Sequence, residues 1–157
     1  QLKNVTEMIG QARASGAEVR ECGRVPDEVL YRRGYFQKPA LVFNPDQSLD
    51  IVAVEQFGPA LSIMPFDSET EAIRRANDSR YGLCSSVCTK DRDRALTISR
   101  QLEAGYTYLN NHGPTAQDFR GPFGSFKDSG FGRNLGYEGV VQFQGHHSIS
   151  SVPAWLF

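Results

Sequence analysis

Few side chains in this sequence could act as nucleophiles or metal ligands. Cys22, Cys84 and Cys88 make an odd number of cysteines and lack a CxxC spacing, so we predict neither a disulfide framework nor a zinc site. His146 and His147 are adjacent and would point to opposite faces of a strand, which argues against joint metal ligation. We therefore expect reduced thiols, with Cys84 and Cys88 packed in a core, and no metal.

Two polar residues follow apolar runs where a strand could end. Glu55 lies between the run Ile51–Val54 and a Phe-Gly-Pro turn, and the residues alone favour a strand-end carboxylate that faces solvent. Asn110 ends a largely apolar and aromatic strand, where a turn-forming asparagine is the plain interpretation. The pattern Gly130-Phe131-Gly132 is weak evidence for phosphate binding because no clear strand precedes it.

The elements that must position these residues alternate between strands and helices. We expect a helix at 2–15, followed by strands at 19–22, 40–43 and 60–66. A second helix should run from the capping box Ser68–Glu71 to Asn77 and lead into a strand at 83–89. A third helix, capped by Asp91 and ended by Gly105, should precede a strand at 106–110. Residues 23–39 are expected to form a loop. The β-α-β-α-β order predicts an α/β fold with a parallel-sheet core and right-handed crossovers.

This topology also predicts where a ligand would bind. In open α/β sheets ligands gather beyond the carboxyl ends of the strands, here just after Phe66, Thr89 and Asn110. The glycine-rich stretch Asn111–Arg133 is the longest irregular one, and such loops are usually functional. A short helix around 135–143 and a terminal edge strand at about 146–151 are expected to complete a single domain over residues 1–157.

Composition restricts the partners of the chain. Its 157 residues, with 39% hydrophobic and 11% aromatic side chains, can form one folded domain. A formal charge of -1, from well-mixed basic and acidic residues, does not indicate a basic surface that would bind nucleic acid or an anionic membrane. No apolar run approaches the roughly 18 residues that span a bilayer, and no leader opens the chain, so we expect a soluble, cytoplasmic protein. The start on Gln1, inside a helical pattern, indicates a piece of something longer.

Five stretches together resemble the aldehyde dehydrogenase superfamily, and the resemblance runs from Leu2 to about Ser150. They stand in the family's order at near-family spacing, which makes chance agreement very unlikely. The five are Gly34-Tyr35-Phe36-x-x-Pro39-Ala40, Glu55-Gln56-Phe57-Gly58-Pro59, Ala76-Asn77-Asp78-Ser79-x-Tyr81-Gly82-Leu83, Leu102-Glu103-Ala104-Gly105 ahead of Asn110, and Pro122-Phe123-Gly124-Ser125-Phe126-Lys127-x-Ser129-Gly130-x-Gly132-Arg133.

The resemblance implies roles for particular residues. In similar proteins a glutamate at the place of Glu55 binds the nicotinamide ribose of NAD or NADP, and the aromatic residue at Phe57 packs near the nicotinamide. Asn110 would help to organise the active-site loop. Asn111, His112 and Phe123 would line the passage through which an aldehyde substrate approaches, although a short insertion precedes Gly121. The last strand resembles the family's oligomerisation strand, which implies a homo-oligomer.

Other features of the family are missing or changed. The nucleophilic cysteine and the dinucleotide-binding domain lie upstream in similar proteins, so this chain by itself is expected to be inactive. Asn134 stands where the family usually has a glutamate that relays protons during deacylation. Either that relay is dispensable, or the protein is slow or non-catalytic. The resemblance thus implies part of an NAD(P)-dependent oxidoreductase, and the alternative is a non-catalytic assembly or binding module of the same fold.

Overall fold

The first helix confirms the amphipathic pattern at the start of the chain. In the computed structural model, which describes residues 1–152, α1 spans Leu2–Ala14 and buries Val5, Ile9 and Ala12 along one face. These side chains form one core cluster together with the buried residues Ala40, Val42, Ile51 and Ala60. The chain divides into two compact units, one from Gln1 to Ala72 and one from Ile73 onward, and this cluster is the core of the first.

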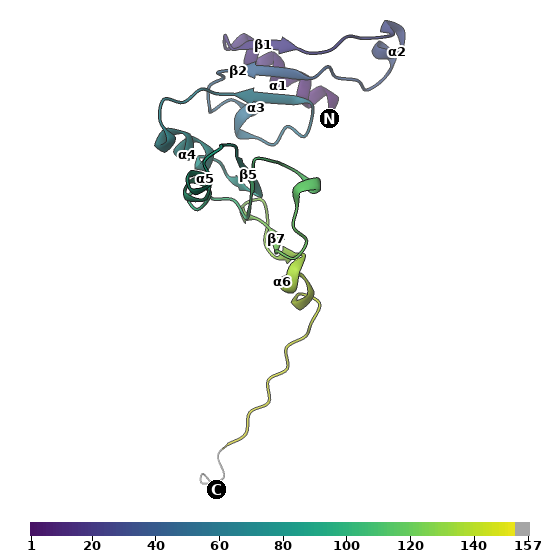
Figure 1. Ribbon diagram of the computed structural model, residues 1–157. Helices are drawn as coiled ribbons and strands as arrows, with labels where there is room; N and C mark the ends of the chain where they lie inside the picture. The colour runs from purple at the N-terminus through teal and green to yellow at the C-terminus, as the bar shows by residue number, and fades with distance from the viewer. Residues whose placement is uncertain (153–157) are drawn as a thin grey trace. The chain divides into compact units, whose positions relative to one another are not determined.

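A three-stranded sheet covers this helix in the first unit (Figure 1). Strands β1 (Glu18–Glu21), β2 (Ala40–Phe43) and β3 (Ala60–Ile63) lie in that order. β1 is antiparallel to β2, whereas β2 and β3 are parallel, with Ala40 opposite Ala60. The three strands lie within or close to the ranges predicted from the sequence.

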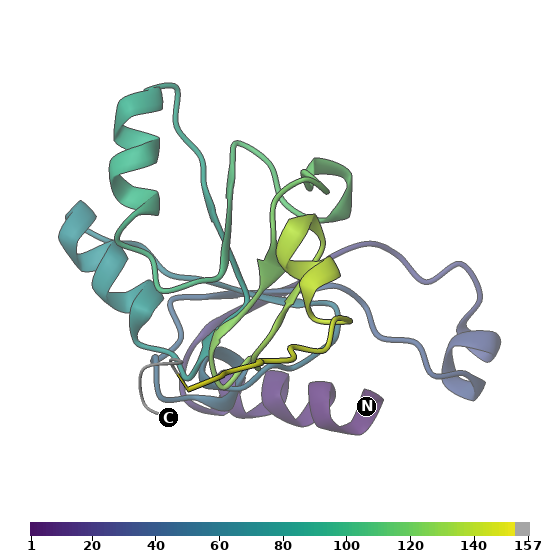
Figure 2. The same cartoon turned by 90° about the horizontal axis from the view of Figure 1, so that it is seen from below.

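Two short helices in this unit correct the sequence interpretation. The predicted loop at 23–39 contains α2 (Glu28–Arg33), whose first turn is capped by Asp27, and both views place α2 at the tip of a long connection (Figure 1, Figure 2). The run Ile51–Val54 is not a strand, because Asp50–Ala53 forms helix α3. Periodicity cannot distinguish a strand from a helical turn in so short an apolar run.

Helix α4 (Glu69–Asn77) begins at the predicted capping residues. The hydroxyl of Ser68 accepts a hydrogen bond from the Glu71 backbone N–H at 3.2 Å. The Glu71 carboxylate accepts from the backbone N–H of Asp67 at 2.9 Å, one residue earlier than a standard capping box requires. The predicted start of the helix is therefore confirmed.

The second unit contains the second strand-helix-strand part of the predicted β-α-β-α-β run, whereas β3, the strand before α4, pairs with β2 in the sheet of the first unit. Strands β5 (Cys84–Val87) and β6 (Tyr106–Leu109) are parallel neighbours joined through helix α5 (Arg92–Ser99). The Asp91 side chain caps α5 by accepting a hydrogen bond from the Arg94 N–H at 3.0 Å. The carboxyl ends of β5 and β6 meet at one edge, which is where ligands gather in such sheets.

Short ladders order the glycine-rich stretch after β6. It contains the 3₁₀ turn η1 (Pro114–Ala116) and two-residue strands β7 (Phe123–Gly124), β8 (Phe126–Lys127) and β9 (Arg133–Asn134), followed by helix α6 (Gly136–Val141). β7 pairs antiparallel with β9, and β8 pairs antiparallel with β4 (Tyr81–Gly82). The stretch expected to be a long loop is thus partly fixed by backbone pairing.

The α/β class is confirmed, with parallel pairs in both units. Residues 144–152 form no helix or strand in this chain, so the edge strand at 146–151 stays a prediction that requires a partner strand. In the part of the chain that the structure describes, no helix is long and apolar enough to cross a bilayer.

Candidate functional site

The predicted cofactor residues Glu55 and Phe57 lie just after helix α3, on an irregular segment of the first unit. Within residues 1–152 the Glu55 carboxylate makes no hydrogen bond or ion pair, and the residue is exposed. It is therefore free to accept hydrogen bonds from a ligand. Two acceptor oxygens on a carboxylate match the two hydroxyls of a ribose.

Phe57 has an unusual backbone conformation. Its φ is 46°, in the left-handed region, and its side chain is 80% exposed. This conformation costs a non-glycine residue roughly 1–2 kcal/mol, and strained residues of this kind cluster at ligand sites. The Gln1 amide donates to the Phe57 carbonyl at 3.1 Å and to the Gln56 carbonyl, which holds the segment in place.

An open groove of about 480 Å³ lies beside Phe57 in the same unit. Its walls include the side chains of Leu2, Val5, Phe36 and Pro59. An exposed aromatic ring at the edge of an apolar groove, with an unpaired carboxylate two residues away, suits a flat ring attached to a sugar. The cofactor role of Glu55 and Phe57 stays a prediction, and the unpaired carboxylate and the exposed ring are compatible with it.

Asn110 joins the carboxyl ends of β5 and β6 in the second unit. Its backbone N–H donates to the Val87 carbonyl at 2.9 Å, and its side-chain oxygen accepts from the Thr89 N–H at 2.8 Å. Its φ is 54°, a left-handed conformation that asparagine tolerates better than most residues. The turn-forming interpretation is thus correct, and the same bonds fix where the loop after β6 begins.

His112 stands over the end of β5 and is exposed. Its Nδ1 lies 2.5 Å from the hydroxyl oxygen of Ser86, and its ring lies 5.1 Å from the Tyr108 ring. Asn111 orients the same turn, since its side-chain oxygen accepts from the His112 N–H at 2.8 Å. The structure therefore brings Asn110, Asn111 and His112 together at this edge.

A row of aromatic rings connects this edge to Phe123. The Tyr108 ring lies 4.7 Å from that of Tyr106, and Tyr106 lies 5.7 Å from Phe123. The Tyr106 hydroxyl also accepts from the Asp118 N–H at 3.0 Å, which ties down the intervening loop. In the β7–β9 ladder Phe123 lies opposite Asn134, so two residues separated along the glycine-rich stretch are direct neighbours.

A hollow of about 230 Å³ opens beside this ladder. Phe123, Asn134, Ser125 and Arg133 line it. The Arg133 guanidinium donates to the carbonyls of Ser125 at 3.0 Å and Gly132 at 2.8 Å, which braces the two sides of the hollow. Asn134 is exposed and its side chain makes no hydrogen bond within residues 1–152.

The sequence interpretation missed Tyr106, Tyr108 and Ser86. Alternation along the strand after Gly105 places Tyr106 and Tyr108 on one face, and that signal was available. Ser86 gave no signal, because only the fold brings it to His112. The prediction of two core cysteines is half correct: Cys84 is partly buried, and Cys88 is exposed. Burial raises the pKa of the Cys84 thiol, which makes it a poor nucleophile.

The comparison with protein families decides the relationship. Residues 1–149 match the sequence model of the aldehyde dehydrogenase family. The chain belongs to this family. Among curated aldehyde dehydrogenases, 4-trimethylaminobutyraldehyde dehydrogenase of Oryzias latipes is 40% identical over 138 residues, which cover 86% of this chain and 27% of that protein. Aminoaldehyde dehydrogenase 1 of Pisum sativum, named peroxisomal, is 37% identical over 91% of this chain and 28% of its own length.

Solved aldehyde dehydrogenases share the fold. Apo betaine aldehyde dehydrogenase of Staphylococcus aureus superposes with a TM-score of 0.81 at 35% identity, over 90% of this chain and 28% of that one. An aldehyde dehydrogenase of Mycobacterium tuberculosis in complex with NAD+ gives a TM-score of 0.77 at 38% identity, over 91% of this chain and 29% of that one. The chain thus spans less than a third of the relatives that it matches.

Proposed function

We propose that the full-length protein oxidises an aldehyde to a carboxylate with NAD or NADP as hydride acceptor. In this proposal the chain is the carboxy-terminal part of the catalytic domain. The observation that carries the proposal is the family match over residues 1–149. The five motifs in family order support it, and so do the aldehyde dehydrogenase names of the relatives.

Glu55 and Phe57 are the cofactor residues of this proposal. The Glu55 carboxylate would accept hydrogen bonds from the ribose hydroxyls, and Phe57 would contact the nicotinamide ring. The unpaired carboxylate and the exposed, strained aromatic residue support these roles. The bound cofactor would take up the hydride that leaves the aldehyde carbon. That the aldehyde dehydrogenase of Mycobacterium tuberculosis binds NAD+ supports the choice of ligand.

Asn110, Asn111, His112 and Phe123 are the proposed residues of the substrate passage. Asn110 would set the start of the loop through its bond to Thr89, and the other three would present their side chains to the aldehyde. Their grouping along one edge and one row of aromatic rings supports this assignment. Asn134 occupies the place of the family's proton-relay glutamate, beside Phe123.

The chain by itself should not oxidise aldehydes. The family reaction needs a cysteine thiolate that adds to the aldehyde carbon, after which hydride leaves and water hydrolyses the thioester. By resemblance that cysteine lies upstream, and the raised pKa of the Cys84 thiol makes it a poor substitute. The alternative non-catalytic module predicts inactivity for the full-length protein as well.

The experiment compares two proteins under the same conditions. The 157-residue chain and the full-length protein are each incubated with NAD or NADP and a panel of aldehydes, and reduced cofactor is measured by its absorbance. The panel includes amino and trimethylamino aldehydes, because relatives are named for them. Activity confined to the full-length protein is expected. Reduction by the chain alone would overturn its predicted inactivity, and no activity in a folded full-length protein would favour the non-catalytic module.

We further propose a cytoplasmic homo-oligomer in which residues 146–151 pair with a second copy. Phe143 is 91% exposed and Ile149 is 87% exposed, which supports the burial of these apolar side chains against a second copy in the assembly. Light scattering of the full-length protein, with and without Ile149→Pro, tests the assembly. A monomeric wild type would refute it. Cell fractionation tests the location, which the peroxisomal name of one relative makes worth measuring.

A further inference from the structure

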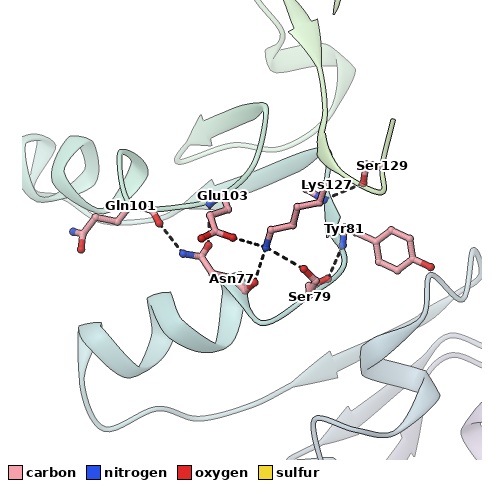
Figure 3. A network of polar contacts seen from close by, with 8 residues as sticks. Asn77, Ser79, Tyr81, Gln101, Glu103, Lys127 and Ser129 are labelled. Atoms are coloured by element: carbon pink, nitrogen blue, oxygen red, sulfur yellow. Dashed lines mark hydrogen bonds and ion pairs between the residues drawn. The ribbon is translucent and has the colours of Figure 1, made fainter. Parts of the chain in front are cut away.

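The ammonium group of Lys127 is the centre of a polar network in the second unit (Figure 3). Its Nζ donates to the backbone carbonyls of Asn77 at 2.6 Å and Ser79 at 3.0 Å, and it lies 2.6 Å from a carboxylate oxygen of Glu103. An ammonium group has three N–H donors, so these three acceptors use its full capacity. The Lys127 side chain is 23% exposed, whereas most other ion-paired side chains of the protein are more open.

The acceptors create a site that favours a positive charge. Asn77 is the last residue of α4, so its carbonyl belongs to the negative end of the helix dipole. Glu103 adds a full negative charge from the connection between α5 and β6. The two carbonyls and the carboxylate all point toward the same atom, and without the ammonium group they would lose their common partner.

The Asn77 side chain ties the end of α4 to the connection between α5 and β6 through two further hydrogen bonds. Its side-chain oxygen accepts from the Glu103 N–H at 2.9 Å, and its amide nitrogen donates to the Gln101 carbonyl at 2.7 Å. Figure 3 shows that the end of α4, the connection before β6 and strand β8 converge on these side chains. Lys127 is the only contribution of β8 to this junction, within the contacts of the described residues.

The backbone around Lys127 is held at the same time. Its φ is 52°, a left-handed conformation that disfavours a lysine, and its strand pairs with Tyr81 of β4. Two residues later the Ser129 hydroxyl accepts from the Gly82 N–H at 2.9 Å. A strained backbone persists where surrounding contacts over-determine it, and the ammonium group supplies three of those contacts.

Lys127 lies on β8, which separates the two paired strands β7 and β9 along the chain. β8 is placed in the sequence between β7, which carries Phe123, and β9, which carries Asn134. A shift at Lys127 therefore moves the chain on both sides of the hollow that these residues line. We infer that Lys127 is a positioning residue of the aldehyde-oxidising site, whose ammonium group seats the loop that carries Phe123 and Asn134. This inference rests on the proposed function.

The test uses the full-length enzyme and asks whether the charge, and not only the packing, sets activity. Lys127→Ala removes the ammonium group, and Lys3→Ala is the matched control, because the Lys3 side chain is exposed on α1 of the first unit. We expect Lys127→Ala to lower kcat/KM for the aldehyde by about tenfold to a hundredfold, because misplacement of about 1 Å has costs of that order. The dissociation constant of NAD should stay within about twofold of the wild-type value, a change that corresponds to less free energy than one hydrogen bond contributes. Lys3→Ala should match the wild type.

Rescue separates positioning from a merely structural role. Propylammonium completes the missing side chain and can donate three hydrogen bonds, so it should restore part of kcat/KM in Lys127→Ala. Tetramethylammonium at the same ionic strength cannot donate and should not. If Lys127→Ala does not fold, Glu103→Gln replaces it, and we expect a smaller fall in kcat/KM in the same direction.

The inference is overturned by wild-type kcat/KM in a folded Lys127→Ala, by equal rescue with both ammonium ions, or by wild-type kcat/KM in the substitute Glu103→Gln. Loss of NAD binding in parallel with kcat/KM would do so as well, since it indicates general damage. Absence of aldehyde oxidation in the wild-type enzyme is a different result. That result refutes the proposed function and is established before any variant is compared.

Discussion

Replacement of Glu55 by glutamine is the most direct test of the cofactor site. The change keeps the shape of the side chain but removes its charge and one acceptor oxygen. Because Glu55 is exposed and has no partner within residues 1–152, the free energy of unfolding should change by less than about 0.5 kcal/mol. A loss of function in Glu55→Gln would therefore come from the ligand and not from the fold.

The expected magnitude follows from the bond that is weakened. A hydrogen bond to a charged group contributes about 1.5–3 kcal/mol, which corresponds to a roughly tenfold to 150-fold weaker interaction with the ribose. In the full-length protein, titration calorimetry measures NAD affinity and stopped-flow absorbance measures hydride transfer. Glu7→Gln is the control, since Glu7 is exposed on α1 of the same unit and forms only a 3.7 Å pair with Lys3. Unchanged affinity together with an unchanged hydride-transfer rate would refute the ribose role of Glu55.

Three further predictions address packing, deacylation and charge. Gly105→Ala should destabilise the fold by about 1–3 kcal/mol in urea, because its new Cβ would lie 1.9 Å from the Gly124 carbonyl oxygen, whereas Gly10→Ala, with open space, should be neutral or stabilising. Asn134→Glu should raise steady-state turnover without enlarging the burst of NADH, if hydrolysis of the acyl-enzyme limits the rate. The Asp118 carboxyl should titrate by NMR with a pKa of about 2, lowered mainly by its hydrogen bonds from Arg120, and Arg120→Gln should raise that pKa. Because the pKa is lowered in the folded state, any stability that this pair contributes is present above pH of about 4 and is lost as pH falls toward 2.

The parts of the fold that the sequence predicted are those with local signals. Helix α1 follows from the spacing of Val5, Ile9 and Ala12, and α5 follows from the cap at Asp91. Helix α3 was misread because only Ile51 is buried in it, so four apolar residues gave no usable period. The short strands after β6 could not be foreseen either, since each has only two residues, and β8 depends on its distant partner β4.

The candidate site likewise contains residues with a local sequence signal and residues without one. Asn110 was predictable as a turn residue from its place at the end of a strand, and the structure explains how it fixes that turn. The contact between Ser86 and His112 joins residues 26 apart, and no local pattern indicates it. The roles of Glu55, Phe57 and Phe123 came from resemblance alone and remain predictions.

The family motifs of this chain contain two physically different kinds of residue. Asn77, Glu103 and Lys127 belong to three separate motifs, yet they meet in one network and satisfy one another. Gly105 and Gly124 belong to two of these motifs, and a Cβ on Gly105 would collide with the Gly124 backbone. Contacts within the fold account for these residue types, and the positioning role proposed for Lys127 rests on the same contacts.

Glu55 and Asn134 are of the other kind, because both are exposed and neither side chain has a partner within the described residues. A substitution at such a position changes the chemistry at almost no cost to the fold. In this chain Asn134 stands where the resemblance implies a glutamate, while the motifs that build the loop are kept. The resemblance to the family is carried mainly by the first kind of residue, whereas the proposed cofactor and deacylation roles belong to the second. For this reason turnover of the full-length Asn134→Glu variant tells more about the protein than any further similarity in the loop around Lys127.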